Sequence, residues 1–273
     1  MIELNKIYNE SNCETMARMP DNFIDLTVTS PPYDNLRDYE GYSFNFERVA
    51  QELFRVTKEG GIVVWVVNDA VIDGSETLTS AKQKIYFREN CGFKIHDTMI
   101  YKKNGAPFPD KTRYDQVFEY MFVLSKGKPK TVNLIKDKKN KWAGSKNFGT
   151  RTNRLKNGEI GTSSLADKEV NEFGVRYNIW EYKTGFGYST TDKIAYEHPA
   201  IFPEKLAQDH ILSWSNEREI VYDPFMGSGA VAKMCIKTNR NYVGSEISKK
   251  YCDIAEKRIL PYKQEIDMFH KVS

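Results

Sequence analysis

The sequence predicts an α/β protein with a doubly wound, mostly parallel sheet and an irregular basic insert. Apolar runs typical of strands alternate along the chain with segments whose apolar residues have helical spacing, which is the pattern of such sheets. The interval 127–187 interrupts this alternation, because it is rich in Gly, Asn and Lys and has few periodic segments. With 273 residues, of which 40% are hydrophobic, the chain can bury the core of one large domain.

The expected strands are short apolar runs, several of them apolar throughout, as strands covered on both faces are. In chain order they are Ile24–Thr29, Gly61–Asn68, His96–Tyr101, Val117–Leu124, Glu219–Tyr222 and Asn241–Val243. The expected helices lie between these runs and carry their apolar residues at helical spacing. They are Phe46–Lys58, Glu76–Asn90, Glu204–Ser213, Gly229–Lys237 and Ser248–Ile259.

Positive charge is concentrated in one part of the chain. The net charge is only +3, but Lys126–Lys156 holds eleven Lys or Arg against the single acid Asp137, so this stretch carries +10 and the remainder −7. A charge run alone is more often a solvated loop. Here aromatic and Asn side chains lie among the basic ones and can stack on bases or bond to their edges, which favours DNA contact. The expected DNA-binding residues are Arg113, Lys138, Lys139, Lys141, Trp142, Lys146, Arg151 and Arg154.

A strand that ends at two prolines is the first candidate site. The sequence Thr-Ser-Pro-Pro-Tyr occupies Thr29–Tyr33, and each proline fixes φ and removes an N–H, which leaves rigid carbonyl acceptors. With the Ser30 hydroxyl and the flat ring of Tyr33, this loop offers a planar pocket that accepts hydrogen bonds from an NH₂ group, such as a nucleobase amine. An isolated Pro-Pro-Tyr would more often be a plain turn.

A second strand, much later in the chain, runs into a glycine-rich turn. Val221–Gly229 reads Val-Tyr-Asp-Pro-Phe-Met-Gly-Ser-Gly, and its glycines allow a ligand close to the backbone at the carboxyl edge of a parallel sheet. The next short strand is followed by Glu246, about 20 positions after the turn, where an acid can hold the hydroxyls of an adenosine ribose. The turn lacks the third glycine of a dinucleotide site, so the two features together predict an adenosine site.

Taken together, these motifs resemble those of the amino-group DNA methyltransferases that use S-adenosylmethionine. Their order, with the Pro-Pro-Tyr motif before the glycine turn, is similar to that of the permuted beta class. Arg113–Gly127 and His198–Leu206 are also similar to family segments, so the resemblance covers most of the chain. It implies a Rossmann-like methyltransferase fold, a single catalytic domain over residues 1–273 and a target-recognition insert at 127–187.

The resemblance assigns the chemistry to Ser30, Pro31, Pro32 and Tyr33. An exocyclic base amine is a poor nucleophile because its lone pair is delocalised into the ring, whereas the sulfonium methyl of S-adenosylmethionine is strongly electrophilic. Ser30 Oγ and the Pro31 carbonyl would accept the two amine hydrogens, so that the lone pair points at the methyl group and transfer is direct. The base would leave the duplex, Tyr33 would stack on it, and Pro32 would hold the angle of that ring.

The resemblance also implies which residues bind the cofactor. Glu246 is expected on the ribose hydroxyls. Asp223 and the backbone at Gly227 and Gly229 are expected around the methionine part, with Phe225 as an apolar wall.

Two further parts of the cofactor site have alternative interpretations. His198, Phe202 and Pro203 are candidates for the methionine end, although His198 stands before a proline and could equally cap a turn. Where the family usually has an acid before a Cys near the N-terminus, this chain has Asn12. The side-chain carbonyl of Asn12 could accept a hydrogen bond from the adenine amine, or Ser11 could do so after a shift of one residue.

The target base is the least determined feature. The motif Ser-Pro-Pro-Tyr begins with Ser30, which is more similar to the cytosine-N4 members of the family than to the adenine-N6 members. The sequence of the segment Phe202–Leu206 is also more similar to the cytosine-N4 members. The sequence therefore favours cytosine N4, with adenine N6 as the alternative. A catalytically inactive DNA-binding relative is more remote, because it would be expected to lose Ser30, Tyr33, Asp223 or Glu246, and all four are present.

The composition predicts a cytoplasmic protein, and the resemblance implies that a prokaryote or a phage encodes it. The longest apolar stretch, Ile62–Val67, is far shorter than the ~20 residues of a membrane span, and the N-terminus has no signal-like apolar segment. The four cysteines lack metal-site spacing, so they are expected to be reduced and no metal is expected. The expected partner is double-stranded DNA, with a homodimer and a cognate restriction endonuclease as further candidates.

Overall fold

The protein is described from a computed structural model, which describes residues 2–32, 44–105, 111–146, 150–164 and 168–272. The chain forms two compact units. The sheet unit comprises Met1–Asn133 and Asn178–Ser273, and the insert unit comprises Leu134–Tyr177. Within the described ranges, no helix has both the length and the apolar character that a membrane span requires.

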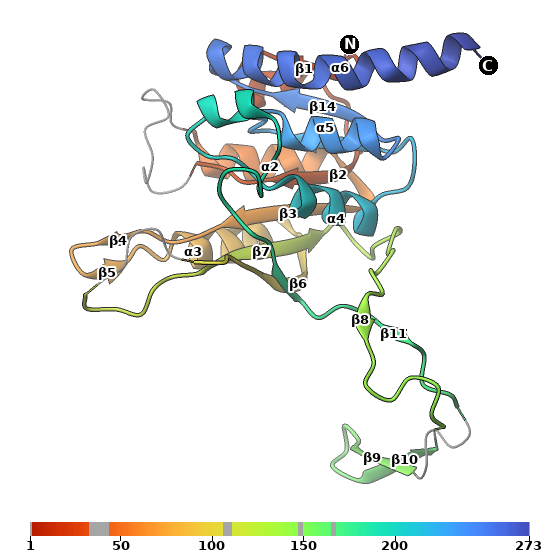
Figure 1. Cartoon of the computed structure of the whole chain (residues 1–273). Coiled ribbons are helices and arrows are strands. Elements are labelled where there is room, and N and C mark those ends of the chain that lie inside the picture. Colours follow the sequence, from red (N-terminus) through yellow and green to blue (C-terminus); the bar gives the residue numbers. More distant parts are fainter. Residues whose placement is uncertain (1, 33–43, 106–110, 147–149, 165–167, 273) are drawn as a thin grey trace. The chain divides into compact units, whose positions relative to one another are not determined.

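The sheet unit is built on a mostly parallel sheet (Figure 1). In the described residues this sheet has eight strands, in the order β1-β14-β13-β2-β3-β7-β6-β12. Strand β7 runs antiparallel to both of its neighbours, β3 and β6, whereas the other pairs are parallel. The strands span Lys6–Tyr8 (β1), Ile24–Thr29 (β2), Thr57–Val67 (β3), Lys94–Lys102 (β6), Phe118–Ser125 (β7), Ile179–Glu181 (β12), Ile220–Asp223 (β13) and Asn241–Ser245 (β14).

Helices cover both faces of this sheet. Helices α4, α5 and α6 pack side by side on one face, and α1, α2 and α3 with its π-helical extension η1 lie on the other (Figure 1). The bounds are Asn12–Ala17 (α1), Phe46–Val56 (α2), Thr79–Tyr86 (α3), Phe87–Cys91 (η1), Lys193–Glu197 (the 3₁₀ helix η2), Glu204–Trp214 (α4), Ala230–Lys237 (α5) and Lys249–Val272 (α6). This two-sided cover confirms the predicted doubly wound α/β fold.

The central strands are buried on both faces, which explains why their sequences are apolar throughout rather than alternating. In β3, the residues Ile62–Val67 are all almost fully buried. Trp65 packs edge-on against the rings of Phe46, Phe87 and Phe225, and its indole N–H donates to Gln83 Oε1 at 2.8 Å. The large ring therefore fills the core while its polar atom stays bonded.

The predicted helix Glu76–Asn90 was wrong at its start. Ser75–Glu76 forms strand β5, which pairs with β4 (Val71–Ile72) across a tight turn at Asp73 and Gly74, where φ is +50° and +77°. An Asp-Gly pair favours this kind of hairpin turn, and the helix begins only at Thr79. The three-residue strands β1 and β12 were not predicted, because runs this short carry no readable periodicity.

The insert unit consists of short antiparallel ribbons. Strand β8 (Lys138–Lys139) pairs with β11 (Phe173–Gly174), and β9 (Thr150–Arg154) pairs with β10 (Ile160–Ser164). The unit covers 134–177, a narrower range than the irregular interval 127–187. The flanks of that interval belong to the sheet unit, where β12 adds to the edge of the main sheet.

Candidate active site

The two motifs found in the sequence meet at one edge of the sheet. Strands β2 and β13 are parallel neighbours, with Leu26 opposite Val221 and Thr27 opposite Tyr222, so they end side by side (Figure 1). At these ends the hydroxyl of Thr29 donates to Asp223 Oδ1 at 2.7 Å. A single buried hydrogen bond therefore links the residue before Ser30 to the start of the glycine turn.

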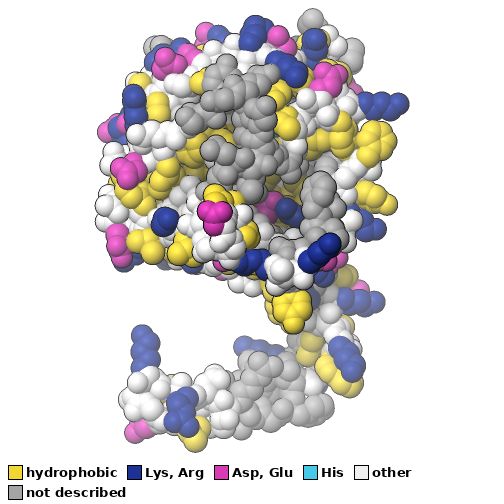
Figure 2. Space-filling model, turned by 90° about the vertical axis from the view of Figure 1, so that its left-hand side faces the viewer, with side chains coloured by type: hydrophobic (Ala, Val, Ile, Leu, Met, Phe, Trp, Pro, Cys, Tyr) yellow, Lys and Arg dark blue, Asp and Glu magenta, His cyan; other side chains and the backbone are white. Residues whose placement is uncertain are grey.

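A pocket of about 950 Å³ opens at this carboxyl edge. Its volume is within the range of small-molecule sites. Figure 2 looks onto this edge and shows hydrophobic side chains among acidic and basic ones. The predicted site residues that line the pocket are Asn12, Ser30, Pro32, His198, Phe202, Pro203, Asp223, Phe225, Gly227 and Glu246.

Three predicted site residues are not part of this lining. Pro31 is buried but is not among the residues that line the pocket. Tyr33 lies outside the described residues. Gly229 precedes α5 with φ at +81°, and a Cβ there would lie 3.0 Å from Cβ of Ala255 in α6, so its lack of a side chain serves the packing of two helices.

Asp223 is a buried carboxyl at the centre of the site. Only 5% of the residue is exposed, and its Oδ1 also accepts the Phe225 N–H at 3.0 Å. Burial raises the pKa of Asp223 to about 7, the hydrogen bonds from Thr29 and Phe225 act in the opposite direction, and the nearby Glu246 carboxylate adds to the rise. The carboxyl is therefore only partly ionised near neutral pH.

Glu246 follows β14 and is held by backbone groups on two sides. Its Oε2 accepts the Gly227 N–H at 2.8 Å, and its Oε1 accepts the Ser248 N–H at 2.9 Å. Glu246 lines the pocket, where its carboxylate supplies hydrogen-bond acceptors. Such acceptors are what the two hydroxyl donors of a ribose diol require.

Gly227 and His198 face each other across the pocket wall. Gly227 has φ at +51°, and a Cβ on it would lie 3.1 Å from His198 Nε2. His198 Nδ1 lies 2.7 Å from the Ala200 carbonyl and 3.1 Å from its nitrogen, and the imidazole packs edge-on against Tyr251 with ring centroids 4.3 Å apart. His198 thus both lines the pocket and fixes the local turn, so both roles considered for it have a structural counterpart.

Asn12 is the first residue of α1 and is 9% exposed. Its Nδ2 donates to the Pro224 carbonyl at 3.3 Å, which leaves the side-chain carbonyl as the acceptor for a ligand. The Ser11 hydroxyl instead caps the helix, accepting the Glu14 N–H at 3.3 Å. Of the two residues considered for the adenine amine, the contacts favour Asn12.

Further polar residues at the same edge were missed by the sequence reasoning. Asn68, directly after β3, donates to the Phe118 carbonyl at 3.0 Å and accepts from Gln116 at 3.1 Å. Lys103 and Glu119 form an ion pair of 2.5 Å in the pocket lining. Asn68 could have been found from its position at a strand end. Gln116 and Glu119 could not, because they reach this edge only through the reversed direction of β7.

Most of the predicted DNA-binding residues lie in the insert unit. Lys139, Lys141, Lys146 and Arg154 are exposed. Trp142 is 68% exposed, with the Lys141 ammonium 5.3 Å from its ring, and the Lys138 ammonium lies 4.4 Å from the Tyr177 ring. Arg151 lies on β9. Arg113 belongs to the sheet unit, where it donates to the Gly74 carbonyl.

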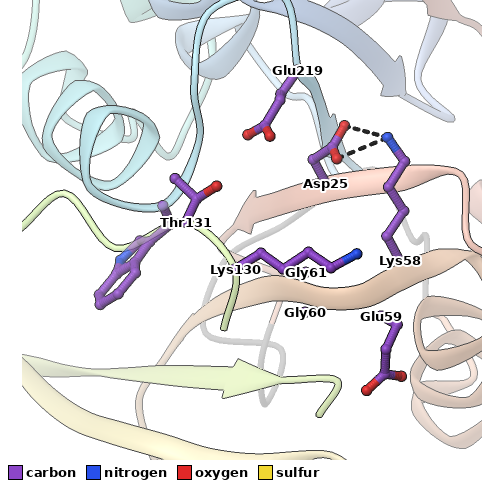
Figure 3. A pocket seen from close by; sticks show the side chains of 9 residues that line it. Asp25, Lys58, Glu59, Gly60, Gly61, Lys130, Thr131 and Glu219 are labelled. Atoms are coloured by element: carbon purple, nitrogen blue, oxygen red, sulfur yellow. Dashed lines mark hydrogen bonds and ion pairs between the residues drawn. The ribbon is translucent and has the colours of Figure 1, made fainter. Parts of the chain in front are cut away.

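A second, much smaller pocket lies at the opposite, amino edge of β2 and β3 (Figure 3). It measures about 50 Å³ and contains none of the predicted site residues. Both carboxylate oxygens of Asp25 accept from the Lys58 ammonium, at 2.8 and 2.7 Å, as the dashed lines in Figure 3 show, and Oδ2 also accepts the Ile220 N–H at 2.9 Å. The pocket is too small for a nucleoside, so the large pocket is the candidate site.

Comparison with known proteins decides the family. The model of the family described as DNA methylase matches residues 24–257. The chain belongs to this DNA methylase family. It is 62% identical over 239 residues to the orphan methyltransferase M.BamHII of Bacillus amyloliquefaciens, a match that covers 88% of this chain and 89% of the relative. It is 27% identical over 267 residues to the type II methyltransferase M.BglII of Bacillus subtilis, covering 92% and 68%.

Solved structures support the fold of this DNA methylase. The cytosine-N4-specific PvuII DNA methyltransferase matches with a TM-score of 0.65 at 15% identity, over 96% of this chain and 92% of the other. The DNA modification methylase TTHA0409 of Thermus thermophilus, complexed with S-adenosyl-L-methionine, matches with a TM-score of 0.63 at 22% identity, over 94% and 93%. The chain is a DNA amino-methyltransferase of the N4/N6 family.

The residues of the large pocket fit S-adenosylmethionine. A carboxylate with two backbone donors stands where a ribose diol can bind, and the Gly227 position leaves room that a Cβ would fill. The amide of Asn12 offers a neutral acceptor. These features meet in a pocket large enough for the cofactor and for part of a second ligand.

Proposed function

We propose that this enzyme methylates the N4 amine of cytosine within a specific site in double-stranded DNA. The observation that carries the proposal is the Thr29–Asp223 hydrogen bond, which joins the Ser30 loop to the glycine turn at one pocket. Ser30 at the first tetrapeptide position favours cytosine N4, and adenine N6 is the alternative target. The amine chemistry is the same for both bases.

The catalytic step needs groups that accept the hydrogens of the target amine. When bound, S-adenosylmethionine would supply an electrophilic methyl group and leave as S-adenosylhomocysteine, and the methylated amine would then lose one proton to solvent. Ser30 Oγ and the Pro31 carbonyl would accept one amine hydrogen each, which concentrates the nitrogen lone pair on the side away from these acceptors. The two prolines hold the acceptors rigid, so little reorganisation is needed during transfer.

The cofactor-binding roles proposed here follow the contacts of each residue. Glu246 would bind the ribose hydroxyls and Asn12 the adenine amine. Asp223 and Gly227 would lie along the methionine part. Phe225 is assigned to the apolar wall. His198, Phe202 and Pro203 are assigned to the methionine end.

The target base would enter the pocket from outside the helix stack. A base inside a duplex cannot present its amine to Ser30, so base flipping is part of the proposal. Tyr33 is assigned the role of stacking on the flipped base, next to Pro32. The polar residues Asn68 and Gln116 would face the remaining edge of the base.

The insert unit is proposed to recognise the DNA site. Its exposed lysines and Trp142 combine phosphate-binding charge with a stacking group.

Residues 1–273 are proposed to form one catalytic domain, with target recognition within 127–187. A homodimer remains a candidate assembly, and an enzyme of bacterial DNA is expected in the cytoplasm. The 62% identical relative is called an orphan methyltransferase, which favours a chain without a paired endonuclease.

The test is chemical identification of the product. DNA methylated by the purified enzyme is digested to nucleosides, which are identified by mass spectrometry. We expect N4-methylcytosine. Recovery of N6-methyladenine would instead establish the alternative base.

Variants test the assigned residues in the same assay. Ser30→Ala, Tyr33→Ala and Glu246→Ala should each reduce transfer of labelled methyl by at least ~100-fold, a range typical of lost transition-state hydrogen bonds and positioning. Ser75→Ala, an exposed hydroxyl in the β4–β5 hairpin, is the matched control and should behave as the wild type. Undiminished transfer by Ser30→Ala or Tyr33→Ala would remove the catalytic assignment.

A further inference from the structure

Two buried cations and two half-buried carboxylates, Asp192 and Glu204, form a charged cluster behind the active-site pocket. Lys233 of α5 and Arg258 of α6 have side-chain exposures of 2% and 0%. The Lys233 ammonium lies 2.8 Å from both Asp192 Oδ2 and Glu204 Oε1, and Arg258 contacts the same two carboxylates. Buried ion pairs of this kind contribute little net stability but are costly to break, because the remaining partner is left buried and unpaired.

Arg258 joins more parts of the chain than Lys233 does. Its Nε donates to Asp192 at 2.7 Å, and its Nη2 donates to Glu204 at 2.5 Å and to the Thr190 hydroxyl at 3.1 Å. Its Nη1 donates to the Ser228 carbonyl at 2.8 Å and to the Ser228 hydroxyl at 3.1 Å. The planar guanidinium can serve these acceptors at once, which an ammonium cannot do.

These contacts connect two stretches that shape the cofactor end of the pocket. Ser228 is the middle residue of the glycine turn, and Gly227 on one side of it lines the pocket. Thr190, Asp192 and Glu204 belong to or border the segment 189–203, which we call the cover segment. The cover segment also contributes His198, Phe202 and Pro203 to the pocket lining. Arg258 itself does not line the pocket.

The cover segment has little regular structure of its own to hold it in place. Within it, the structure assigns only the five-residue helix η2. Its ends are tied by Thr190, whose hydroxyl donates to Glu204 at 2.5 Å, and by the Glu204 N–H, which donates to the Ser189 carbonyl at 3.0 Å. The charged cluster, together with the contact of the His198 ring with Tyr251 of α6, fastens this segment to helices α5 and α6.

The cluster is balanced, with two cations facing two carboxylates. Although burial raises the pKa of Asp192, the hydrogen bonds from Lys233 and Arg258 outweigh it and hold that pKa below its usual value. Asp192 is thus ionised at neutral pH. Loss of Arg258 would leave two carboxylates with one cation and would free the glycine turn from the cover segment.

We propose that Arg258 is a positioning residue for the cofactor site, acting through Ser228 and Asp192 to set the glycine turn against the cover segment. It fixes the distance between Gly227 and His198, which together bound the space for the methionine end. The inference rests on the proposed placement of that end. It predicts that Arg258 affects cofactor affinity although it does not touch the cofactor.

The experiment measures the binding of S-adenosylhomocysteine to the purified full chain by calorimetry, without DNA. Arg258→Gln should weaken binding by at least about tenfold. Arg258→Lys keeps the positive charge but lacks the planar guanidinium with its several donors, so it should weaken binding by about threefold. Lys233→Gln removes the same charge from the same cluster but leaves the turn contact intact, so it should weaken binding by less than twofold. Lys257→Gln, the exposed neighbour on α6, should bind as the wild type does.

Unfolding temperatures of all four variants are measured in parallel. Equal weakening by Arg258→Gln and Lys233→Gln, at similar losses of unfolding temperature, would show that the cluster only supports the fold and would overturn the proposal. If Arg258→Gln does not fold, Arg258→Lys decides: wild-type affinity in that variant overturns the proposal. Because no DNA is present, the outcome does not depend on which base the enzyme methylates.

Discussion

Asp223 shows how one buried side chain ties the site together and makes the fold sensitive to pH. It accepts hydrogen bonds from Thr29 and from the Phe225 backbone, and it lies among apolar groups with 5% exposure. Because burial raises its pKa from 3.8 to about 7, the folded protein holds a proton that the unfolded chain has already lost between these two values. This contribution to stability is complete below about pH 4 and is lost as the pH rises to about 7.

Asp223→Asn should therefore gain stability relative to the wild type as the pH rises. The difference in free energy of unfolding between the variant and the wild type should grow by up to about 4 kcal/mol from pH 4 to pH 8, since one pKa unit corresponds to about 1.4 kcal/mol. Urea unfolding at several pH values measures it. A difference that stays constant over this range would mean that Asp223 is ionised throughout.

The sequence identified those functional residues that belong to short, contiguous motifs. Ser30 and the prolines, or Gly227 and Glu246, carry their meaning in short motifs, and the structure brings them to one pocket. Gln116, Glu119 and Arg258 act through neighbours far away in the sequence, so no local pattern marks them. Asn12 is intermediate, because only its place in a family pattern singled it out.

At the level of elements, the turn between β13 and α5 is fixed by glycines for different reasons. Gly227 leaves space beside His198, whereas Gly229 lets α5 approach α6 at Ala255. Both have positive φ, at +51° and +81°. One glycine of the turn therefore leaves space at the pocket and the other allows two helices to pack closely. In the sequence both appeared as parts of one glycine-rich motif.

Gly229→Ala should lower the free energy of unfolding by about 2–4 kcal/mol, the sum of a left-handed backbone on Ala and the clash with Ala255. Gly74→Ala is the matched control, because its φ is +77° and nothing lies within 4 Å of the added Cβ. It should cost about 1–2 kcal/mol. Equal losses of stability in chemical denaturation would show that the helix contact at Gly229 has no role.

Most elements could be predicted, since long apolar runs and helical spacing are strong local signals. The hairpin at Val71–Glu76 was not predicted, and its last residue, Glu76, was read as the start of a helix, because strands of two residues carry no readable periodicity. The reversed direction of β7 was not predicted either, because strand direction is set by how the chain connects and not by composition. That reversal is what carries Gln116 to the pocket.

At the level of the whole molecule, the charge is divided between the two units. The insert unit, Leu134–Tyr177, holds ten Lys or Arg against five Asp or Glu and so carries +5, which leaves −2 on the sheet unit. Such a division favours contact with DNA through the insert unit while the sheet unit supplies the chemistry. It predicts that DNA affinity and cofactor affinity can be changed separately.

Replacing Lys139 and Lys141 by Gln should weaken DNA binding and make it less dependent on salt. Each lost phosphate contact lowers the slope of log K against log salt by about 0.9, so the double variant should lose roughly 1.8 from the slope. Fluorescence anisotropy with labelled duplex at several salt concentrations measures it. Binding of S-adenosylhomocysteine should not change.

The control is a double variant of Lys237 and Lys257, two exposed lysines on α5 and α6. It removes the same charge from the sheet unit and should keep the wild-type salt slope. Equal effects of the two double variants would mean that net charge, rather than the insert unit, determines DNA affinity.

The central claim is that two distant strand ends, at Ser30 and at Gly227, build one site for the cofactor and the target amine. The most direct measurement is a crystal structure of the protein with S-adenosylhomocysteine bound. The ribose should lie on Glu246, with the sulfur directed toward Ser30. A ligand bound outside this pocket, or with its sulfur directed away from Ser30, would contradict the account.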